Sequence, residues 1–268
     1  MKLNLFIPQK NTIATSITTI TTIETATSKT TTTTKFVNPL DEKYPVLIFL
    51  SDFSHNIESY AEKGFLQHTA CQKGIAIVYP SNSPPDCSYY PWFQEGYGTI
   101  SGASFYLNAT ESEWSNNLKM GSYIVEELPE KLFNDFSELD ASRISIAGHG
   151  MGGHGALTLF LKNPGVYKSV SAFAPICNPI NCPIGKEVFT SYLGSYGKHM
   201  EKWKMNDATE LVKRWLEGPF PCLIDVGTSD ELYLQKQLLP ENFAEAANMS
   251  GVGRDLVIRY QEVKYSLA

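Results

Sequence analysis

A run of glycines in the middle of the chain sets the strongest limit on its fold. Segment 148–153 reads Gly-His-Gly-Met-Gly-Gly, follows the apolar run 143–147 and opens a helical stretch at 154–161. A strand, a sharp turn and a helix in this order make a nucleophile elbow, whose usual pattern is G-x-S-x-G. Here the pattern is G-x-G-x-G, because position 150 is a glycine. The sequence therefore predicts the turn without the serine hydroxyl that it normally presents.

The pattern on either side of this turn predicts an α/β fold. Apolar runs of strand length alternate with segments of helical periodicity, which favours right-handed crossovers between parallel strands. The predicted strands are 45–50, 74–80, 143–147, 169–176, 221–227 and 255–260, and the predicted helices are about 60–72, 114–136, 154–161 and 238–248. We therefore expect a doubly wound, mostly parallel sheet of the α/β-hydrolase type.

The first 42 residues differ in composition from the rest. Residues 1–8 alternate toward an apolar strand, and we interpret them as the first strand of the sheet. Residues 9–42 form a threonine-rich, low-complexity insertion, with 13 threonines between positions 12 and 35 and no alternation that would bury one face. Such a composition predicts a solvated loop or linker. The α/β-hydrolase domain then spans residues 43–268.

Net charge and hydropathy exclude two classes of partner. The formal charge is −6 and the sequence pI is about 5.4, so we expect no nucleic-acid partner. The longest apolar run, 45–50, is far shorter than the roughly 20 residues that span a bilayer, so we expect no membrane segment. No signal peptide is evident at the amino terminus. We expect a cytoplasmic protein whose partner is a small molecule or another protein.

The remaining groups of a catalytic triad can be sought by chain order. A serine hydrolase of this fold needs Ser, then Asp or Glu, then His. Asp230 is the candidate acid, since it follows a predicted strand on a loop at the carboxyl edge of the sheet, and a helix cap is its alternative role. The histidines are at 55, 68, 149, 154 and 199, so none follows Asp230. His149 and His154 project from the elbow itself, whereas a base must approach from a separate loop.

The cysteines form no metal-binding or redox motif. They lie at positions 71, 87, 177, 182 and 222, an odd count without C-x-x-C spacing. We interpret them as buried thiols, and we expect neither a metal site nor a bound cofactor.

Three long stretches are specific enough to indicate a family. They read IAGHGMGGHGAL at 146–157, KNPGVYKSVSAFAPICNP at 162–179 and QLLPENF at 237–243. With a weaker likeness from about 45 to 261, they resemble S-formylglutathione hydrolase, also called esterase D. The resemblance implies a cytosolic, cofactor-free and often dimeric hydrolase that cleaves S-formylglutathione to glutathione and formate in formaldehyde detoxification.

The resemblance also assigns roles to individual positions. The nucleophile position falls on Gly150, where the serine is lost, and the triad acid falls on Asp230. The oxyanion donors would be the backbone N–H groups of Phe53 and Met151. Asp52 replaces a glycine of the family, which sets a carboxylate close to the developing negative charge.

The two ends of the chain depart furthest from the family. After Gln261-Glu262 the family continues Gly-Tyr-Asp-His, whereas this chain reads VKYSLA, so no residue matches the catalytic histidine. By the same resemblance, Lys2 to Ile7 correspond to the family's second strand, and its first strand is absent. We therefore expect an α/β-hydrolase fold truncated at both ends.

These losses together predict an inactive member of the family. Two alternatives stay open: a regulatory or binding subunit that pairs with an intact family member, and a partial gene product of an active serine thioesterase or carboxylesterase. Any substrate would be a small-molecule thioester, and both a homodimer and a heterodimer stay open.

Overall fold

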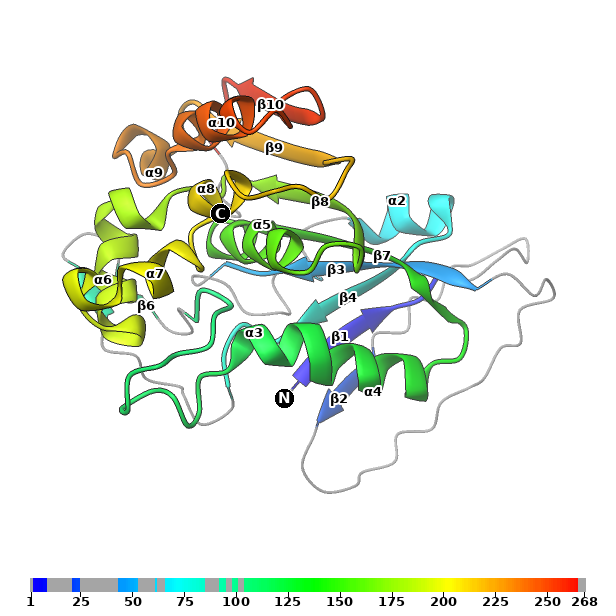
Figure 1. Ribbon diagram of the computed structural model, residues 1–268. Coiled ribbons are helices and arrows are strands. Elements are labelled where there is room, and N and C mark those ends of the chain that lie inside the picture. Colours follow the sequence, from blue (N-terminus) through cyan, green and yellow to red (C-terminus); the bar gives the residue numbers. More distant parts are fainter. Residues whose placement is uncertain are drawn as a thin grey trace.

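An eight-stranded sheet is the main feature of the computed structural model, which describes residues 2–8, 21–24, 43–52, 61, 66–84, 92–94, 98–100 and 104–264 (Figure 1). The strand order is β10-β9-β8-β7-β3-β4-β1-β2. The strands are β1 Lys2–Phe6, β2 Thr21–Glu24, β3 Tyr44–Leu50, β4 Ala76–Pro80, β7 Leu139–His149, β8 Tyr167–Phe173, β9 Cys222–Gly227 and β10 Leu256–Gln261.

Strand direction confirms the predicted α/β sheet. The six neighbouring strands from β10 to β4 run parallel, whereas β1 and β2 pair antiparallel at the far edge. Residues 2–6 form β1, and Leu3 and Leu5 are buried, as the amino-terminal pattern predicted. The sheet is therefore mostly parallel, with one antiparallel edge.

Part of the threonine-rich tract differs from the predicted loop. Thr21–Glu24 form the edge strand β2, in which Ile23 lies opposite Leu3 of β1. β-Branched residues such as threonine favour strands. The edge of β1 also offers backbone hydrogen-bonding groups, with which a segment can pair even when it has no apolar face to bury. The rest of the tract 9–42 lies outside the described residues, and the three domain boundaries stay a prediction.

Helix α5, Met151–Lys162, packs on β7 and β8 in the centre of the molecule (Figure 1). All of its residues except Lys162 are buried. The other helices are α2 Leu66–Lys73, α3 Met120–Ser122, α4 Leu128–Asp135, α6 Pro183–Leu193, α7 Tyr196–Lys204, α8 Ala208–Val212, α9 Glu231–Leu234 and α10 Pro240–Met249, with a 3₁₀ turn at Pro179–Asn181.

The two faces of the sheet build two cores. Successive side chains of a strand point to opposite faces. In β4, Val78 therefore joins the larger core together with α5, whereas Ile77 and Tyr79 join a smaller core with Ala70 of α2. Burial on both faces explains the continuous apolar composition of the central strands.

The helix predicted for 114–136 begins later and is interrupted. The chain becomes helical at α3, passes through a π-helical turn at Tyr123–Glu127 and continues as α4. Pro129 lies in the first turn of α4, where its missing N–H and its ring are tolerated. The proline therefore coincides with the change from the π-helical turn to α4.

The segment between β4 and α3 contains a short hairpin. Strands β5 Trp92–Gln94 and β6 Gly98–Ile100 pair antiparallel in it. None of the helices in the described ranges has the length and apolarity needed to cross a bilayer.

Candidate active site

The turn between β7 and α5 has the geometry of a nucleophile elbow. Gly150 has φ +54° and ψ −117°, a conformation that other residues hold only under strain. Its N–H donates to the carbonyl of Phe173 in β8 at 2.9 Å, and its own carbonyl accepts from the N–H of His154 at 3.1 Å. The structure therefore contains the predicted turn, and residue 150 presents no side chain.

Close backbone packing fixes this turn. A Cβ on Gly152 would overlap the carbonyl oxygen of Leu50, and a Cβ on Gly148 would overlap the carbonyl of Gly152. Neither overlap can be relieved by moving a flexible side chain, so both positions require glycine. The turn is thus held by β3 and α5 independently of any nucleophile.

Asp52 fills the space in front of Gly150. The parallel register of β3 and β7 pairs Leu50 with Gly148, so Asp52, two residues past Leu50, comes level with Gly150. A Cβ on residue 150 would lie 2.5 Å from the carboxylate carbon of Asp52, which is only 5% exposed. A serine side chain at position 150 therefore needs the space that Asp52 occupies.

The Asp52 carboxylate also accepts a hydrogen bond from the N–H of Met151, one of the two predicted oxyanion donors. The N–H of Met151 donates to Asp52 Oδ1 at 2.9 Å, and His149 Nδ1 lies 3.9 Å from Oδ2. Met151 is the first residue of α5, and the partial positive charge of a helix amino terminus stabilises an anion there. A protein carboxylate thus occupies the donor that would bind the oxygen of a tetrahedral intermediate. The second predicted donor, Phe53, lies outside the described residues.

Asp230 caps helix α9. Its Oδ1 accepts from the N–H of Leu232 at 2.8 Å, and its own N–H donates to the carbonyl of Gly227 at 3.1 Å. It is 6% exposed and follows β9. In the part of the chain that the structure describes, no histidine nitrogen is bonded to its carboxylate. The capping role is present, and the role of triad acid stays a prediction.

His154 is a core residue. It is 1% exposed, and its ring centroid lies 5.3 Å from that of Phe105 and 6.2 Å from that of Phe189. Burial, followed by the charge of Lys162, lowers the pKa of His154 to about 3. The imidazole is therefore neutral and enclosed, which excludes it as the base at the elbow.

The described cysteines are free thiols. Burial raises the pKa of Cys177, Cys182 and Cys222, as expected for buried thiols, whereas Cys71 is exposed, against the prediction. Cys87 lies outside the described residues. Within the described ranges, no group of three or more His, Cys, Asp or Glu side chains is placed to hold a metal ion.

Three residues predicted for the site, Gly150, Met151 and Asp52, thus lie together in the structure. Asp230, the predicted acid, caps helix α9. The sequence predicted a carboxylate near the oxyanion site and missed that it enters the nucleophile's own space. The signal that could have found it is the register of the two central strands, which sets residue 52 beside residue 150.

Comparison with known proteins identifies the family to which the chain belongs. The esterase family model matches residues 25–266. The chain is 44% identical over 220 residues to S-formylglutathione hydrolase of Rattus norvegicus, which covers 82% of this chain and 76% of the rat protein. It is 45% identical over 204 residues to S-formylglutathione hydrolase of Arabidopsis thaliana, covering 76% of this chain and 70% of that protein. The solved structure of the Agrobacterium tumefaciens S-formylglutathione hydrolase matches with a TM-score of 0.72 and 36% identity, over 85% of this chain and 79% of that chain. The chain therefore belongs to the S-formylglutathione hydrolase family and has its α/β-hydrolase fold.

Proposed function

We propose that this chain is a non-hydrolytic member of the family, in which Asp52 has taken the place of the nucleophile's side chain. The single observation that carries the proposal is the 2.5 Å between the Asp52 carboxylate carbon and the position of a Cβ on residue 150. The parent reaction is the hydrolysis of S-formylglutathione, after which the relatives are named. The proposed setting is the cytoplasm.

Acyl transfer needs two groups that Gly150 and Asp52 together remove. The first is a nucleophile, and a glycine has none. The second is a donor for the oxyanion, and the N–H of Met151 already donates to Asp52. Loss of the nucleophile in a triad costs on the order of 10⁶ in turnover. The residual acceleration of about 10³ to 10⁴ over water depends on oxyanion donors, so Asp52 suppresses that remainder as well.

The test is an assay of the purified chain with S-formylglutathione and with p-nitrophenyl acetate, beside a relative that carries serine at the elbow. We expect turnover lower by a factor of at least about 10⁶ and no labelling by a fluorophosphonate probe, which reacts with an activated serine. Turnover within an order of magnitude of the relative would overturn the proposal. A matched variant, Asp52→Gly, restores the donor and not the nucleophile, so it is expected to regain at most the residual acceleration of about 10³ to 10⁴ over water and to stay far below the relative.

A second candidate function is that of a binding or regulatory subunit that pairs with an intact family member. It is favoured by apolar exposure on β10, the edge strand at one end of the sheet, where Val257 is 53% exposed and Tyr260 is 44% exposed. Co-expression with a serine-bearing relative, followed by size-exclusion chromatography, is expected to give a defined heteromer. Separate elution of the two chains contradicts this candidate.

A further inference from the structure

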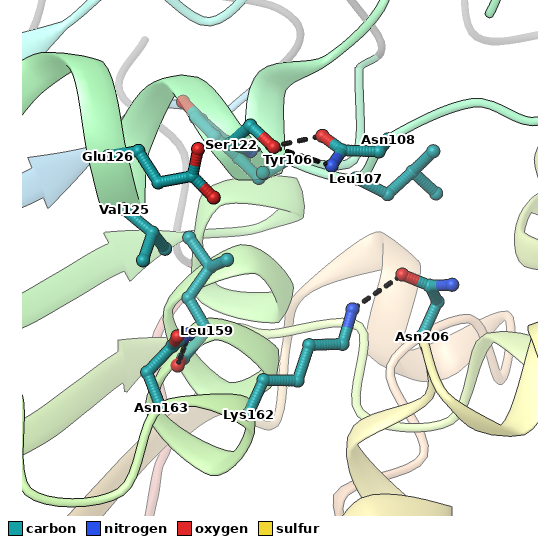
Figure 2. A pocket seen from close by; sticks show the side chains of 11 residues that line it. Tyr106, Leu107, Asn108, Ser122, Val125, Glu126, Leu159, Lys162, Asn163 and Asn206 are labelled. Atoms are coloured by element: carbon teal, nitrogen blue, oxygen red, sulfur yellow. Dashed lines mark hydrogen bonds between the residues drawn. The ribbon is translucent and has the colours of Figure 1, made fainter.

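A polar pocket lies at the other end of α5 from the elbow. Its volume is about 310 Å³, and α5, the π-helical turn and the loops before α3 and α8 form its walls (Figure 2). Lys162, the last residue of α5, belongs to its lining. Lys162 is twelve positions after Gly150, which is about 18 Å along a helix. The pocket is therefore separate from the candidate active site.

Lys162 supplies an incompletely compensated cation to this pocket. Its Nζ donates to Asn206 Oδ1 at 2.6 Å, and no carboxylate of the described residues lies within ion-pair distance of it. Burial lowers the pKa of Lys162 to about 8. An ammonium has three donors and the amide oxygen of Asn206 satisfies one of them. Two donors therefore remain for an acceptor that enters the pocket.

The surrounding polar side chains are fixed by the fold. Each asparagine amide of the lining donates to an atom of the protein, namely Asn108 to Ser122 Oγ, Asn163 to the carbonyl of Leu159 and Asn206 to the carbonyl of Lys202, at 2.9, 2.7 and 2.8 Å. These bonds keep the walls in one arrangement without a ligand. A preformed polar cavity loses little conformational entropy when it binds.

Glu126 places the opposite charge across the pocket. It comes from the π-helical turn and is exposed, whereas Lys162 comes from α5 and is partly buried. Figure 2 shows the two side chains on opposite walls of the cavity. The pocket thus carries a positive charge on its inner wall and a negative charge at its outer wall.

We propose that this pocket binds a small zwitterion that carries a carboxylate and an ammonium group, in the manner of a free amino acid. The carboxylate accepts from the Lys162 ammonium, and the ligand's ammonium faces Glu126. A dianion is disfavoured, because Glu126 and the net charge of −6 repel it. A cation alone is disfavoured by Lys162. This inference does not depend on the proposed loss of hydrolysis at Gly150.

The test is an NMR titration of the isotope-labelled full chain with glycine, β-alanine and 4-aminobutyrate, and separately with acetate and with ethylamine. We expect saturable shifts of the Asn206 side-chain amide with at least one of the three amino acids, and binding about tenfold weaker or more for acetate and ethylamine. Absence of a saturable shift with all three amino acids overturns the proposal. Equal binding of acetate and the amino acids overturns it as well.

Two variants assign the binding to Lys162. Lys162→Met removes the ammonium and is expected to abolish the saturable shift. Asn206→Asp keeps the shape of the side chain and gives Lys162 an internal carboxylate, and binding to it is followed at the side-chain amide of Asn108, another lining residue. It is expected to abolish binding in the same way, which keeps the test valid if Lys162→Met fails to fold. The matched control Lys168→Met changes an exposed lysine outside the pocket and should leave binding unchanged. Binding that survives in Lys162→Met contradicts the proposal.

A third variant tests the outer wall. Glu126→Gln is expected to weaken amino-acid binding by about tenfold and to bring it close to that of acetate. Glu130→Gln, which changes an exposed glutamate outside the pocket, is the control and should have no effect. An unchanged affinity in Glu126→Gln contradicts the assignment of the ligand's ammonium group.

Discussion

A charged side chain lies at each end of helix α5, and the two charges are compensated differently. At the amino-terminal end the Asp52 carboxylate accepts from the N–H of Met151, and at the carboxyl-terminal end the Lys162 ammonium donates to the neutral amide of Asn206. The helix dipole favours both placements, an anion at the first turn and a cation at the last. Asp52 fills its site, whereas Lys162 faces an open pocket. At the amino-terminal end, the Asp52 carboxylate therefore fills the anion site of the helix. At the carboxyl-terminal end, the described residues place no carboxylate beside Lys162, and the pocket there stays open to a ligand.

The largest effect on the free energy of unfolding is expected from protonation of His154, in the first turns of α5. His154 has a pKa of about 3 in the folded protein and 6.5 in the unfolded chain, so the unfolded chain binds the extra proton as the pH falls between these values. The folded state then loses stability by about 1.4 kcal/mol per pH unit below about 6, and by roughly 4–5 kcal/mol at pH 3. Denaturant unfolding of the parent and of His154→Phe across this range measures the difference.

Protonation of Asp207, a buried carboxyl group, has the opposite effect on the stability of the folded state. It must therefore be separated from the effect of His154. Burial raises the pKa of Asp207 to about 6, so protonation of Asp207 adds stability to the folded state as the pH falls from 6 to about 4. This contribution is present in both the parent and His154→Phe and cancels between them. If the difference in free energy of unfolding between the two proteins did not change with pH, burial would not lower the pKa of His154, and the prediction would be wrong.

The next largest effect is expected from Gly150→Ser. The serine would hold φ +54° at a cost of about 1–3 kcal/mol, and its Cβ would meet the Asp52 carboxylate. We expect a loss of roughly 3 kcal/mol in the free energy of unfolding, and a smaller loss in the double variant Asp52→Gly/Gly150→Ser. Chemical denaturation of the four proteins gives the coupling. Additive losses would mean that Asp52 does not obstruct residue 150.

At the carboxyl-terminal end of α5, Lys162→Met is expected to increase the stability of the protein at neutral pH. The depressed pKa means that the charged form of Lys162 destabilises the folded state, so stability rises as the pH increases from about 8 toward 10.5. Removing the charge should therefore stabilise the protein by about 1–2 kcal/mol at pH 7, and the gain should vanish near pH 10.5. Thermal unfolding at both pH values checks this. Lys168→Met should give no gain at either pH.

The smallest effect is expected from Asp52→Asn. The amide oxygen keeps an acceptor for the N–H of Met151, and only the negative charge at the helix amino terminus is lost. We expect a loss of about 1 kcal/mol, and a larger one for Asp52→Ala, which leaves a buried donor without its partner. Equilibrium unfolding at low and high salt separates charge from hydrogen bonding. A more stable Asp52→Asn would contradict stabilisation of the carboxylate by α5.

Local patterns were sufficient to predict the sheet and the elbow. The apolar runs of β3, β4 and β7 and the glycines around position 150 fix strand, turn and helix within a few residues of chain, so the sequence predicts them directly. The edge strand Thr21–Glu24 could not be predicted in this way. Its place depends on pairing with β1 and not on a buried face of its own.

The charged groups at the two ends of α5 depend on distant parts of the chain. Asp52 reaches the elbow because β3 lies beside β7, and the two segments are nearly a hundred positions apart in sequence. Lys162 has the sequence pattern of an ordinary basic residue in the last turn of a helix. Only the packing of α5 against the π-helical turn and the segment around Asn206 shows that it lines a pocket.

The position of Asp52 has a consequence for any ligand of the elbow. A group tethered beside its binding site acts at an effective concentration on the order of millimolar even with a flexible linker, and β3 holds Asp52 directly against the N–H of Met151. A dissolved anion must therefore compete with a carboxylate that never diffuses away. A ligand that needs the N–H of Met151 therefore binds only after the Asp52 side chain has moved away from it.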